Sequence, residues 1–238
     1  MKRWTKTKQC KALSIFCCIS LLLSGVGIFA IGQKTPQPVM AAISQPPATV
    51  ILDPGHGGMD GGAQANGVSE KQINLAIALD LKELLSAMGF RVIMTREDDR
   101  SIHDPQLTQV GRQKRSDLHN RLKLMQQNPQ AIFVSIHQNS LPSSKQTHGA
   151  QVFYGKKEGS AEVANAVQLA LNQTVNAGNE KTEKAIDASI FLMKNVTAPA
   201  ILIECGFLSN ENETALLKSG EYQQKLAVVI ASGLLQQQ

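Results

Sequence analysis

The chain has 238 residues, with 24 Lys and Arg against 19 Asp and Glu and a formal net charge of +5. Residues 1–48 hold six of the 24 basic residues and no acidic residue, so the rest of the chain has 18 basic against 19 acidic side chains. Because the positive excess is N-terminal and aromatic residues make up only 4% of the chain, the composition argues against nucleic-acid binding. The length suits one domain of ordinary size after a targeting segment.

The N-terminus combines a basic flank with a long apolar run. Residues 12–31 carry no charge, and five basic residues precede them: Lys2, Arg3, Lys6, Lys8 and Lys11. This pattern predicts either a membrane span or a long signal segment whose basic flank stays in the cytoplasm. The small residues at 39–42 lie far beyond the run for a cleavage site, so we favour an uncleaved anchor. Residues 32–48 hold four prolines among Gln and Ser, which predicts an extended linker before a domain at 49–238.

The first apolar run of that domain ends in a glycine-rich loop that carries a histidine. Residues 50–53 predict a buried strand, and residues 54–63 hold five glycines around His56. Glycine lets a backbone approach a bound group closely. A phosphate-binding loop would need a lysine and a hydroxyl residue before a helix, and none follows Gly62. Neutral imidazole is a common zinc ligand, whereas a lone loop histidine is more often structural or solvated, so His56 needs partners.

The next element is a helix that begins with a carboxylate. Ser69 and Gln72 have the spacing of a capping box, and apolar residues then follow at helical spacing: Ile73, Ile77, Leu81, Leu84 and Met88. Gly89 marks the predicted end of this helix. Glu70 would be the first helical residue, where a carboxylate complements the helix dipole. Its closeness to the His56 loop makes it a candidate metal ligand as well.

Two further apolar runs end in side chains that can do chemistry. Residues 131–136 are followed by His137, and residues 200–203 are followed by Glu204. Runs of this kind predict strands buried on both faces, and functional residues of open α/β sheets lie just beyond strand carboxyl ends. Two histidines and one carboxylate with an open fourth position make a catalytic zinc site, and a further carboxylate can serve as the base.

The remaining patterns complete an alternation of strands and helices. Strands are predicted at 90–95, 149–154 and, at the sheet edge, 188–193, and helices around 118–125, 163–171 and 226–234. Residues 96–110 form a charged connection. The alternation predicts a single α/β domain of three layers, with a mostly parallel twisted sheet flanked by helices. His103, His119 and His148 follow no apolar strand, and we interpret them as exposed loop residues.

The cysteines exclude a disulfide within the predicted domain. Cys10, Cys17 and Cys18 are N-terminal, and Cys205 is the one cysteine in residues 49–238. Cys205 lies beside Glu204, which raises the alternative of thiol catalysis. After a buried strand, a small hydrophobic role is the better interpretation.

Four spaced motifs resemble those of the zinc-dependent N-acetylmuramoyl-L-alanine amidases of bacterial cell walls. They are residues 53–58 (DPGHGG), 70–71 (EK), 135–139 (SIHQN) and 204–210 (ECGFLSN), and the resemblance runs from about residue 49 to the C-terminus. It implies that His56, Glu70 and His137 bind Zn²⁺ and that Glu204 is the catalytic carboxylate. It also implies a substrate, the glycan strand of peptidoglycan with its stem peptide, and cleavage of the bond between N-acetylmuramic acid and L-alanine.

A narrower resemblance points to sporulation. Residues 94–97 (MTRE), 111–115 (GRQKR) and 195–199 (NVTAP) are similar to the germination-specific amidases of spore-forming bacteria. That subgroup implies action on cortex peptidoglycan in the forespore intermembrane space, where muramic δ-lactam is formed. Two alternatives are a catalytically silent wall-binding or regulatory member of the same fold and a zinc peptidase that cuts within the stem peptide. The sequence identifies no activator protein.

Overall fold

A computed structural model describes residues 48–65, 67–187 and 189–236 of the chain. The predicted anchor at 12–31 and nearly all of the predicted linker at 32–48 lie outside these residues. Within the described ranges, no helix combines the length and the apolar character needed to cross a membrane.

The centre of the domain is a six-stranded sheet with the order β4-β1-β5-β8-β6-β7. The four strands from β4 to β8 are parallel, β6 is antiparallel to β8, and β7 is parallel to β6. Their bounds are β1 Thr49–Pro54, β4 Arg91–Met94, β5 Ile132–Asn139, β6 Gln151–Tyr154, β7 Lys184–Ala185 and β8 Ala200–Phe207. The predicted α/β class with a mostly parallel sheet is therefore confirmed.

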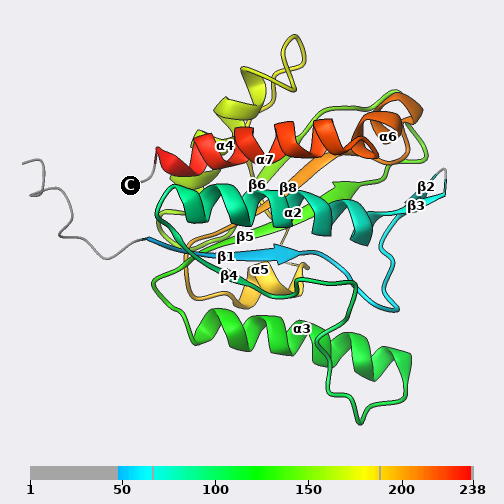
Figure 1. Cartoon of the computed structure of the whole chain (residues 1–238), viewed down its shortest axis with the longest axis vertical. Helices are drawn as coiled ribbons and strands as arrows, with labels where there is room; N and C mark the ends of the chain where they lie inside the picture. Colours follow the sequence, from blue (N-terminus) through cyan, green and yellow to red (C-terminus); the bar gives the residue numbers. More distant parts are fainter. Residues whose placement is uncertain (1–47, 66, 188, 237–238) are drawn as a thin grey trace, which may run out of the picture. The chain divides into compact units, whose positions relative to one another are not determined.

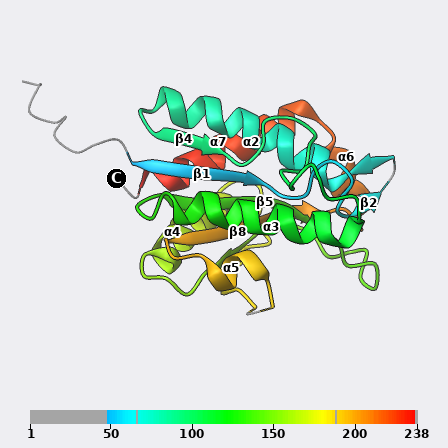
Figure 2. The ribbon, with the colours of Figure 1, turned by 90° about the horizontal axis from the view of Figure 1, so that it is seen from below.

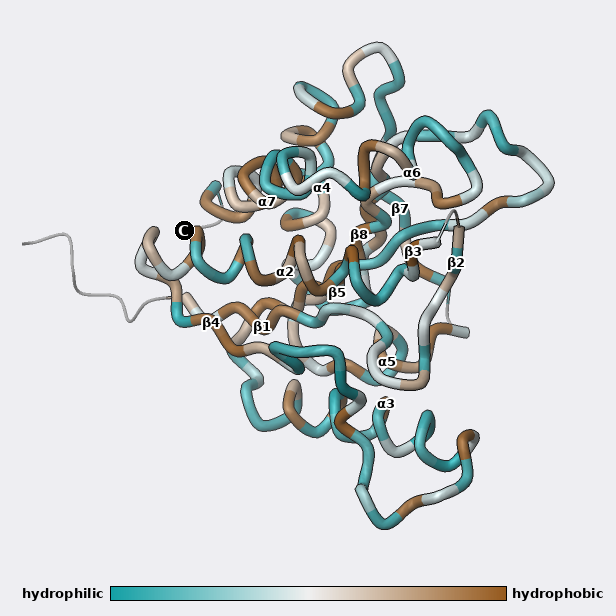
Figure 3. Tube along the Cα trace, turned by 45° about the vertical axis from the view of Figure 1, so that its right-hand side comes forward, coloured by the Kyte–Doolittle hydropathy of each residue, from teal (hydrophilic) through white to brown (hydrophobic). Residues whose placement is uncertain are grey.

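Helices cover both faces of this sheet, which gives the predicted three layers (Figures 1 and 2). On one face lie α2 Glu70–Ala87, α4 Ser160–Asn172 and α7 Gly220–Leu235, and on the other α3 Val110–Gln126 and α5 Phe191–Asn195. The short helix α6 Glu211–Leu217 follows β8, and a small hairpin of β2 Gln64–Ala65 and β3 Val68–Ser69 leads into α2. Hydrophobic segments concentrate in the central strands, and hydrophilic ones in the loops and in much of α3 (Figure 3).

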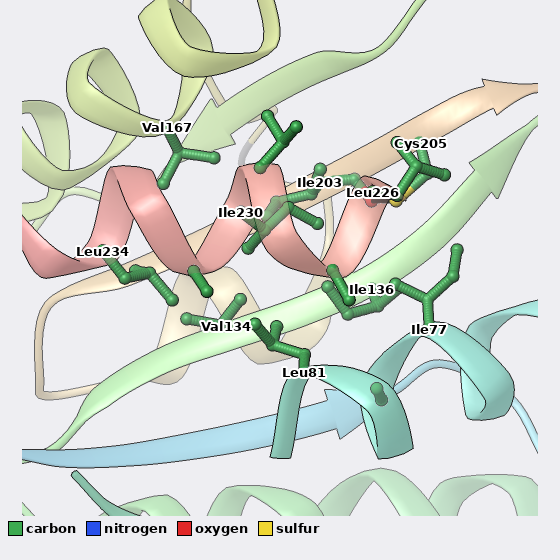
Figure 4. Close-up of a cluster of buried hydrophobic side chains, with 14 of the residues drawn as sticks. Ile77, Leu81, Val134, Ile136, Val167, Ile203, Cys205, Leu226, Ile230 and Leu234 are labelled. Atoms are coloured by element: carbon green, nitrogen blue, oxygen red, sulfur yellow. Dashed lines mark hydrogen bonds between the residues drawn. The ribbon is translucent and has the colours of Figure 1, made fainter. Parts of the chain in front are cut away.

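The larger apolar cluster fills the space between the sheet and helices α2, α4 and α7. Figure 4 shows side chains from β5, β8 and these helices converging there: Ile77, Leu81, Val134, Ile136, Val167, Ile203, Cys205, Leu226, Ile230 and Leu234. Burying a side chain of this size stabilises the fold by about 1.5–3 kcal/mol. Cys205 is fully buried within the cluster, and burial raises the pKa of its thiol. The structure thus confirms a hydrophobic role for Cys205 and leaves no accessible thiolate.

The opposite face of the sheet changes character along its strands. Side chains alternate between the two faces, so Ile51, Phe133 and Leu202 pack towards α3 and α5. Further along the same strands, the same alternation places polar side chains on this face: Asp53, Ser135, His137 and Glu204. The strand carboxyl ends therefore present polar groups beneath α3 and α5.

The predicted edge strand at 188–193 is wrong. Within the described residues, Phe191–Asn195 form helix α5, and the sheet edge beside β6 is β7, which is only two residues long. Leu192, Met193 and Val196 are buried at helical spacing and pack against the face covered by α3, which a strand with alternating burial would not achieve. Strands β5 and β8 also extend past their predicted ends, because they remain hydrogen-bonded to each other through His137 and Glu204 as far as Asn139 and Phe207.

Candidate active site

The loop after β1 holds His56 in an unusual backbone conformation. His56 has a φ of 63°, in the left-handed region, and Gly57 follows with a φ of 135°. The backbone N–H groups of Gly57 and Asp60 each donate to the carbonyl of the other, at 3.0 and 3.1 Å, which closes a tight turn. Within the turn, Nδ1 of His56 lies 2.9 Å from Oδ2 of Asp60. This contact directs the other ring nitrogen, Nε2, towards Glu70, 3.2 Å from its Oε2.

Glu70 lies between the two histidines as the first residue of α2. Its side chain contacts Nε2 of His56 through Oε2 and Nδ1 of His137 through Oε1, the latter at 2.9 Å. The backbone N–H of Ala63 donates to Oε2 at 2.9 Å, and that of Gln138 donates to Oε1 at 3.1 Å. Burial alone would raise the pKa of Glu70, but the hydrogen bonds with His137 and His56 outweigh it and hold this pKa well below its usual range. Glu70 is therefore a carboxylate at neutral pH.

Two glycines make room for this arrangement. A Cβ atom on Gly55 would overlap the ring of His137, and one on Gly62 would overlap Oε2 of Glu70. The glycine-rich loop thus lets the backbone pass directly against the side chains of the site, as the sequence predicts for a loop that approaches a bound group.

The structure brings together the three side chains that the sequence singles out as candidate ligands. One donor atom from each of His56, Glu70 and His137 lies within 4.8 Å of the other two. Two imidazoles and one carboxylate are a donor set that zinc accepts with a fourth position left open. The other histidines lie elsewhere: His103 contacts Ser101 and His148 contacts the Gln146 carbonyl. The interpretation of His119 as a loop residue is wrong, because it lies within helix α3, where it packs edgewise on Phe191.

Glu204 stands beside this cluster without joining it. It is the register partner of His137 on the neighbouring parallel strand, so both side chains project towards α3 and α5. Its Oε2 atom is buried and has no hydrogen-bond partner among the described residues. Burial raises the pKa of Glu204 to about 7, the nearby His137 lowers it and Glu70 raises it. A carboxyl group with this pKa can both accept and donate a proton near neutral pH.

Two buried arginines, which the sequence analysis missed, bind backbone carbonyl groups of the His56 loop. Nη2 of Arg121, on α3, donates to the carbonyl of His56 at 2.7 Å, and Nη1 donates to that of Pro54 at 3.1 Å. Nη2 of Arg96 donates to the carbonyl of Gly55 at 3.0 Å, and its Nε donates to that of Pro54 at 2.9 Å. The side chains are only 1% (Arg96) and 2% (Arg121) exposed. Three successive carbonyls of the loop are therefore fixed by guanidinium groups.

Arg121 is in turn held between two carboxylates. Its Nε donates to Asp117 at 2.7 Å, and its Nη1 donates to Asp53, which also accepts from Thr95 and Ser135. Burial would raise the pKa of Asp53, but the guanidinium of Arg121 and these hydroxyl groups hold it below its usual range. The available sequence signals for this network were the i,i+4 spacing of Asp117 and Arg121 and the acidic residue at the end of the first apolar strand, Asp53.

The site opens into a hollow of about 410 Å³. His56 and His137 line one side of it, and Leu118 of α3 and Leu192 of α5 line the other. The cleft thus lies at the strand carboxyl ends of a mostly parallel α/β sheet, next to two histidines and a buried carboxylate. Together with a second carboxyl group of raised pKa, this arrangement is typical of a hydrolase whose cleft can hold a metal ion.

Comparisons with known proteins give the family. Residues 50–236 match the model of the N-acetylmuramoyl-L-alanine amidase family, and the chain belongs to it. The germination-specific N-acetylmuramoyl-L-alanine amidase of Bacillus subtilis is 38% identical over 186 residues, which cover 78% of each chain. The protein is thus a peptidoglycan amidase.

Solved structures agree with the sequence comparison. The CwlD amidase of Clostridioides difficile, determined in complex with the GerS lipoprotein, is 41% identical, with a TM-score of 0.76 over 79% of this chain and 97% of that one. An N-acetylmuramoyl-L-alanine amidase of Clostridium difficile 630 is 28% identical, with a TM-score of 0.68 over 81% of this chain and 97% of that one. The fold prediction and the family resemblance are confirmed.

Proposed function

We propose that this amidase is zinc-dependent, that His56, Glu70 and His137 hold the ion, and that Glu204 is its catalytic acid and base. The observation that carries the proposal is the set of three donor atoms within 4.8 Å of one another, beside a carboxyl group whose buried oxygen has no hydrogen-bond partner in the part of the chain that the structure describes. Zinc at such a site supplies Lewis-acid polarisation of the amide carbonyl and lowers the pKa of a bound water to about 7.

The side chains of the chain divide the remaining work. Asp60 holds Nδ1 of His56, and the loop carbonyls are fixed by Arg96 and Arg121, so the His56 ring keeps one orientation. Glu204 takes a proton from the attacking water as the new C–O bond forms. It then returns this proton to the nitrogen of L-alanine as the C–N bond breaks, so one carboxyl group with a pKa of about 7 serves both transfers.

Mass spectrometry of digested peptidoglycan tests the reaction. We expect peptides with a free L-alanine amino terminus and glycan whose muramic acid carries no peptide. A zinc peptidase would instead release products cut within the stem peptide. A catalytically silent wall-binding protein would release none, and either result would overturn the proposal.

Metal analysis tests the ligand set. We expect the purified domain to bind about one zinc per chain and His137→Ala to lose most of it, because two remaining ligands hold zinc poorly. Unchanged stoichiometry in this variant would remove His137 from the site. Lys123→Gln, a change on the exposed side of α3, serves as a control for general effects of mutation.

We propose further that the protein acts on spore cortex and forms muramic δ-lactam together with a deacetylase. The germination-specific relative and the 94–115 resemblance support this role. The complex of the C. difficile amidase with a lipoprotein supports a protein partner here too. Deletion of the gene should leave vegetative growth intact, while spores lack cortex δ-lactam and germinate poorly. Normal lactam in the deletion strain would exclude this role.

The same proposal places the enzyme outside the cytoplasm, anchored or secreted through residues 1–31, with a linker at 32–48 and the catalytic domain at 49–238. We expect residues 49–238 to fold and stay soluble alone, because the domain has its own apolar core and needs no disulfide. Aggregation of this fragment under reducing conditions with zinc present would contradict the boundary.

A further inference from the structure

The hollow at the candidate metal site continues along α3. A second hollow of about 490 Å³ shares three lining residues with the first: Asp60, Lys114 and Asp117. Its other walls come from the turn after His56, from the 101–103 segment and from the start of α3, where the exposed apolar side chains of Met59 and Val110 face it. The two hollows therefore form a path that leads from His56 and His137 to one side of the site.

The charged side chains along this path are nearly all engaged with one another. Asp117 accepts from Arg121, from the Ser101 hydroxyl and from the Ile102 backbone N–H. Asp60 contacts His56 on one side and Nζ of Lys114 on the other, at 3.2 Å. The Lys114 side chain is 58% exposed, and Asp60 is its one ion-pair partner in the described part of the chain. An ammonium group has three donors, so Lys114 can bind a further acceptor in the hollow.

We propose that this joined hollow receives the stem peptide and that Lys114 pairs with the carboxylate of the residue after L-alanine. The proposal rests on the amidase function, and it names the part of the substrate that the residues of this hollow recognise. In peptidoglycan, that residue is a glutamate joined through its side chain, so its α-carboxylate is free. The glycan strand is neutral by comparison and gives an ammonium group no charge to recognise.

The geometry favours the peptide for a second reason. A glycan strand continues on both sides of each muramic acid and needs a groove that passes the site, whereas the peptide is a branch that leaves in one direction. L-alanine carries the scissile nitrogen, and the carboxylate of the next residue lies roughly 7 Å from that nitrogen in an extended chain. Oδ2 of Asp60 lies 2.9 Å from Nδ1 of His56 and 3.2 Å from Nζ of Lys114, so the ammonium group lies close enough to the His56 ring to fall within that reach. Met59 and Val110 would then contact the aliphatic parts of the peptide.

The test compares two soluble muramoyl tripeptides that are identical except at the α-carboxyl group of the second residue. This group is a free acid in one substrate and a carboxamide in the other. We expect the parent enzyme to cleave the acid with about five-fold higher kcat/KM, mainly through KM, since partly exposed ion pairs contribute modestly. Lys114→Gln should abolish this preference and Lys114→Arg should restore it. Lys123→Gln, which removes an equal charge from the exposed side of α3, should keep it.

Three results would overturn the proposal: no preference in the parent, a preference that survives Lys114→Gln, or an equal loss on both substrates. The last would mean that Lys114 acts through Asp60 on His56. If the parent cleaves neither tripeptide, the amidase assignment fails instead. Equilibrium binding of the two tripeptides to Glu204→Gln, with and without Lys114→Gln, then still decides whether Lys114 reads the carboxylate.

Discussion

The two faces of the sheet are formed by the same strands but have different roles. On the α2, α4 and α7 face, the side chains of β5 and β8 are apolar as far as Ile136 and Cys205: Val134, Ile136, Ile201, Ile203 and Cys205. On the α3 and α5 face, the intervening positions change from apolar residues to Ser135, His137 and Glu204. The apolar face thus supplies the stability that lets the other face hold strained and partly unsatisfied groups.

The variant Glu204→Gln tests most directly whether the two faces have separate roles, because it should impair catalysis without changing stability. This change keeps the size of the side chain but removes its ability to take a proton, so turnover should fall by about 10²–10⁴-fold, towards the upper end because one group serves two transfers. Zinc content and the thermal midpoint should stay near those of the parent. Hydrolysis within a few-fold of the parent would contradict the assignment, and loss of zinc would make Glu204 a ligand.

Arg121→Met should destabilise the polar face, because it leaves Asp53 and Asp117 without the guanidinium group that both contact. Removing one partner of a buried ion pair costs about 3–5 kcal/mol, so the free energy of unfolding should drop by that amount at pH 7. Denaturant unfolding measures it, with Arg115→Met on the exposed side of the same helix as the matched control. An effect no larger than that of the control would show that the network is not stabilising.

The same variant has an expected pH dependence. In the parent the folded-state pKa of Asp53 is lowered, so its contribution to stability is full above the unfolded value of about 3.9 and is lost as the pH falls below it. Without Arg121, burial should raise the pKa of Asp53. The charged carboxylate then lowers the free energy of unfolding at neutral pH, and protonation at lower pH removes this destabilisation. The stability difference between parent and Arg121→Met should therefore narrow between pH 7 and pH 4, and a constant difference would contradict this explanation.

Leu81→Ala should destabilise only the packing on the apolar face. Leu81 is fully buried between α2 and the sheet, and truncation of such a side chain costs about 2–5 kcal/mol. We expect lower stability by denaturant titration, with unchanged zinc stoichiometry and turnover per folded molecule within a few-fold of the parent. Leu216→Ala, at an exposed leucine of α6, is the control and should change stability little. A large loss of turnover in folded Leu81→Ala would mean that the two faces are not separable.

The smallest expected effect is that of Asp60→Asn. The amide keeps the shape of the carboxylate but weakens the contact with Nδ1 of His56 that orients the ring. Loss of such a supporting carboxylate typically lowers metal affinity by about 10–100-fold. Competition with a chelator measures the affinity, and Asp98→Asn, at an exposed aspartate that pairs with Arg100, is the control. An unchanged zinc affinity would show that the loop backbone alone orients His56.

The sequence predicted the sheet, the main helices and the side chains that meet at the site because each of these has a local pattern. His56, His137 and Glu204 follow apolar runs, and Glu70 follows a capping residue. Arg96 and Arg121 were missed because a buried arginine looks like any surface charge until its carbonyl partners are placed in space. Strand β7 has two residues and no pattern to detect, and residues 188–193 were misread because a short apolar stretch fits a strand as well as a helical turn. The roles assigned to the site residues remain predictions.

The three candidate ligands lie at residues 56, 70 and 137, so a group that binds all three connects distant parts of the chain. A metal ion bound at His56, Glu70 and His137 would cross-link residues 81 positions apart, in a domain whose one described cysteine, Cys205, is buried and unpaired. Closing a chain segment of that length removes conformational freedom from the unfolded state, as a disulfide does, and a ligand that binds only the folded state adds stability with its concentration. Zinc would then cross-link the folded chain as well as serve as a cofactor, so the melting temperature should rise with the concentration of free zinc.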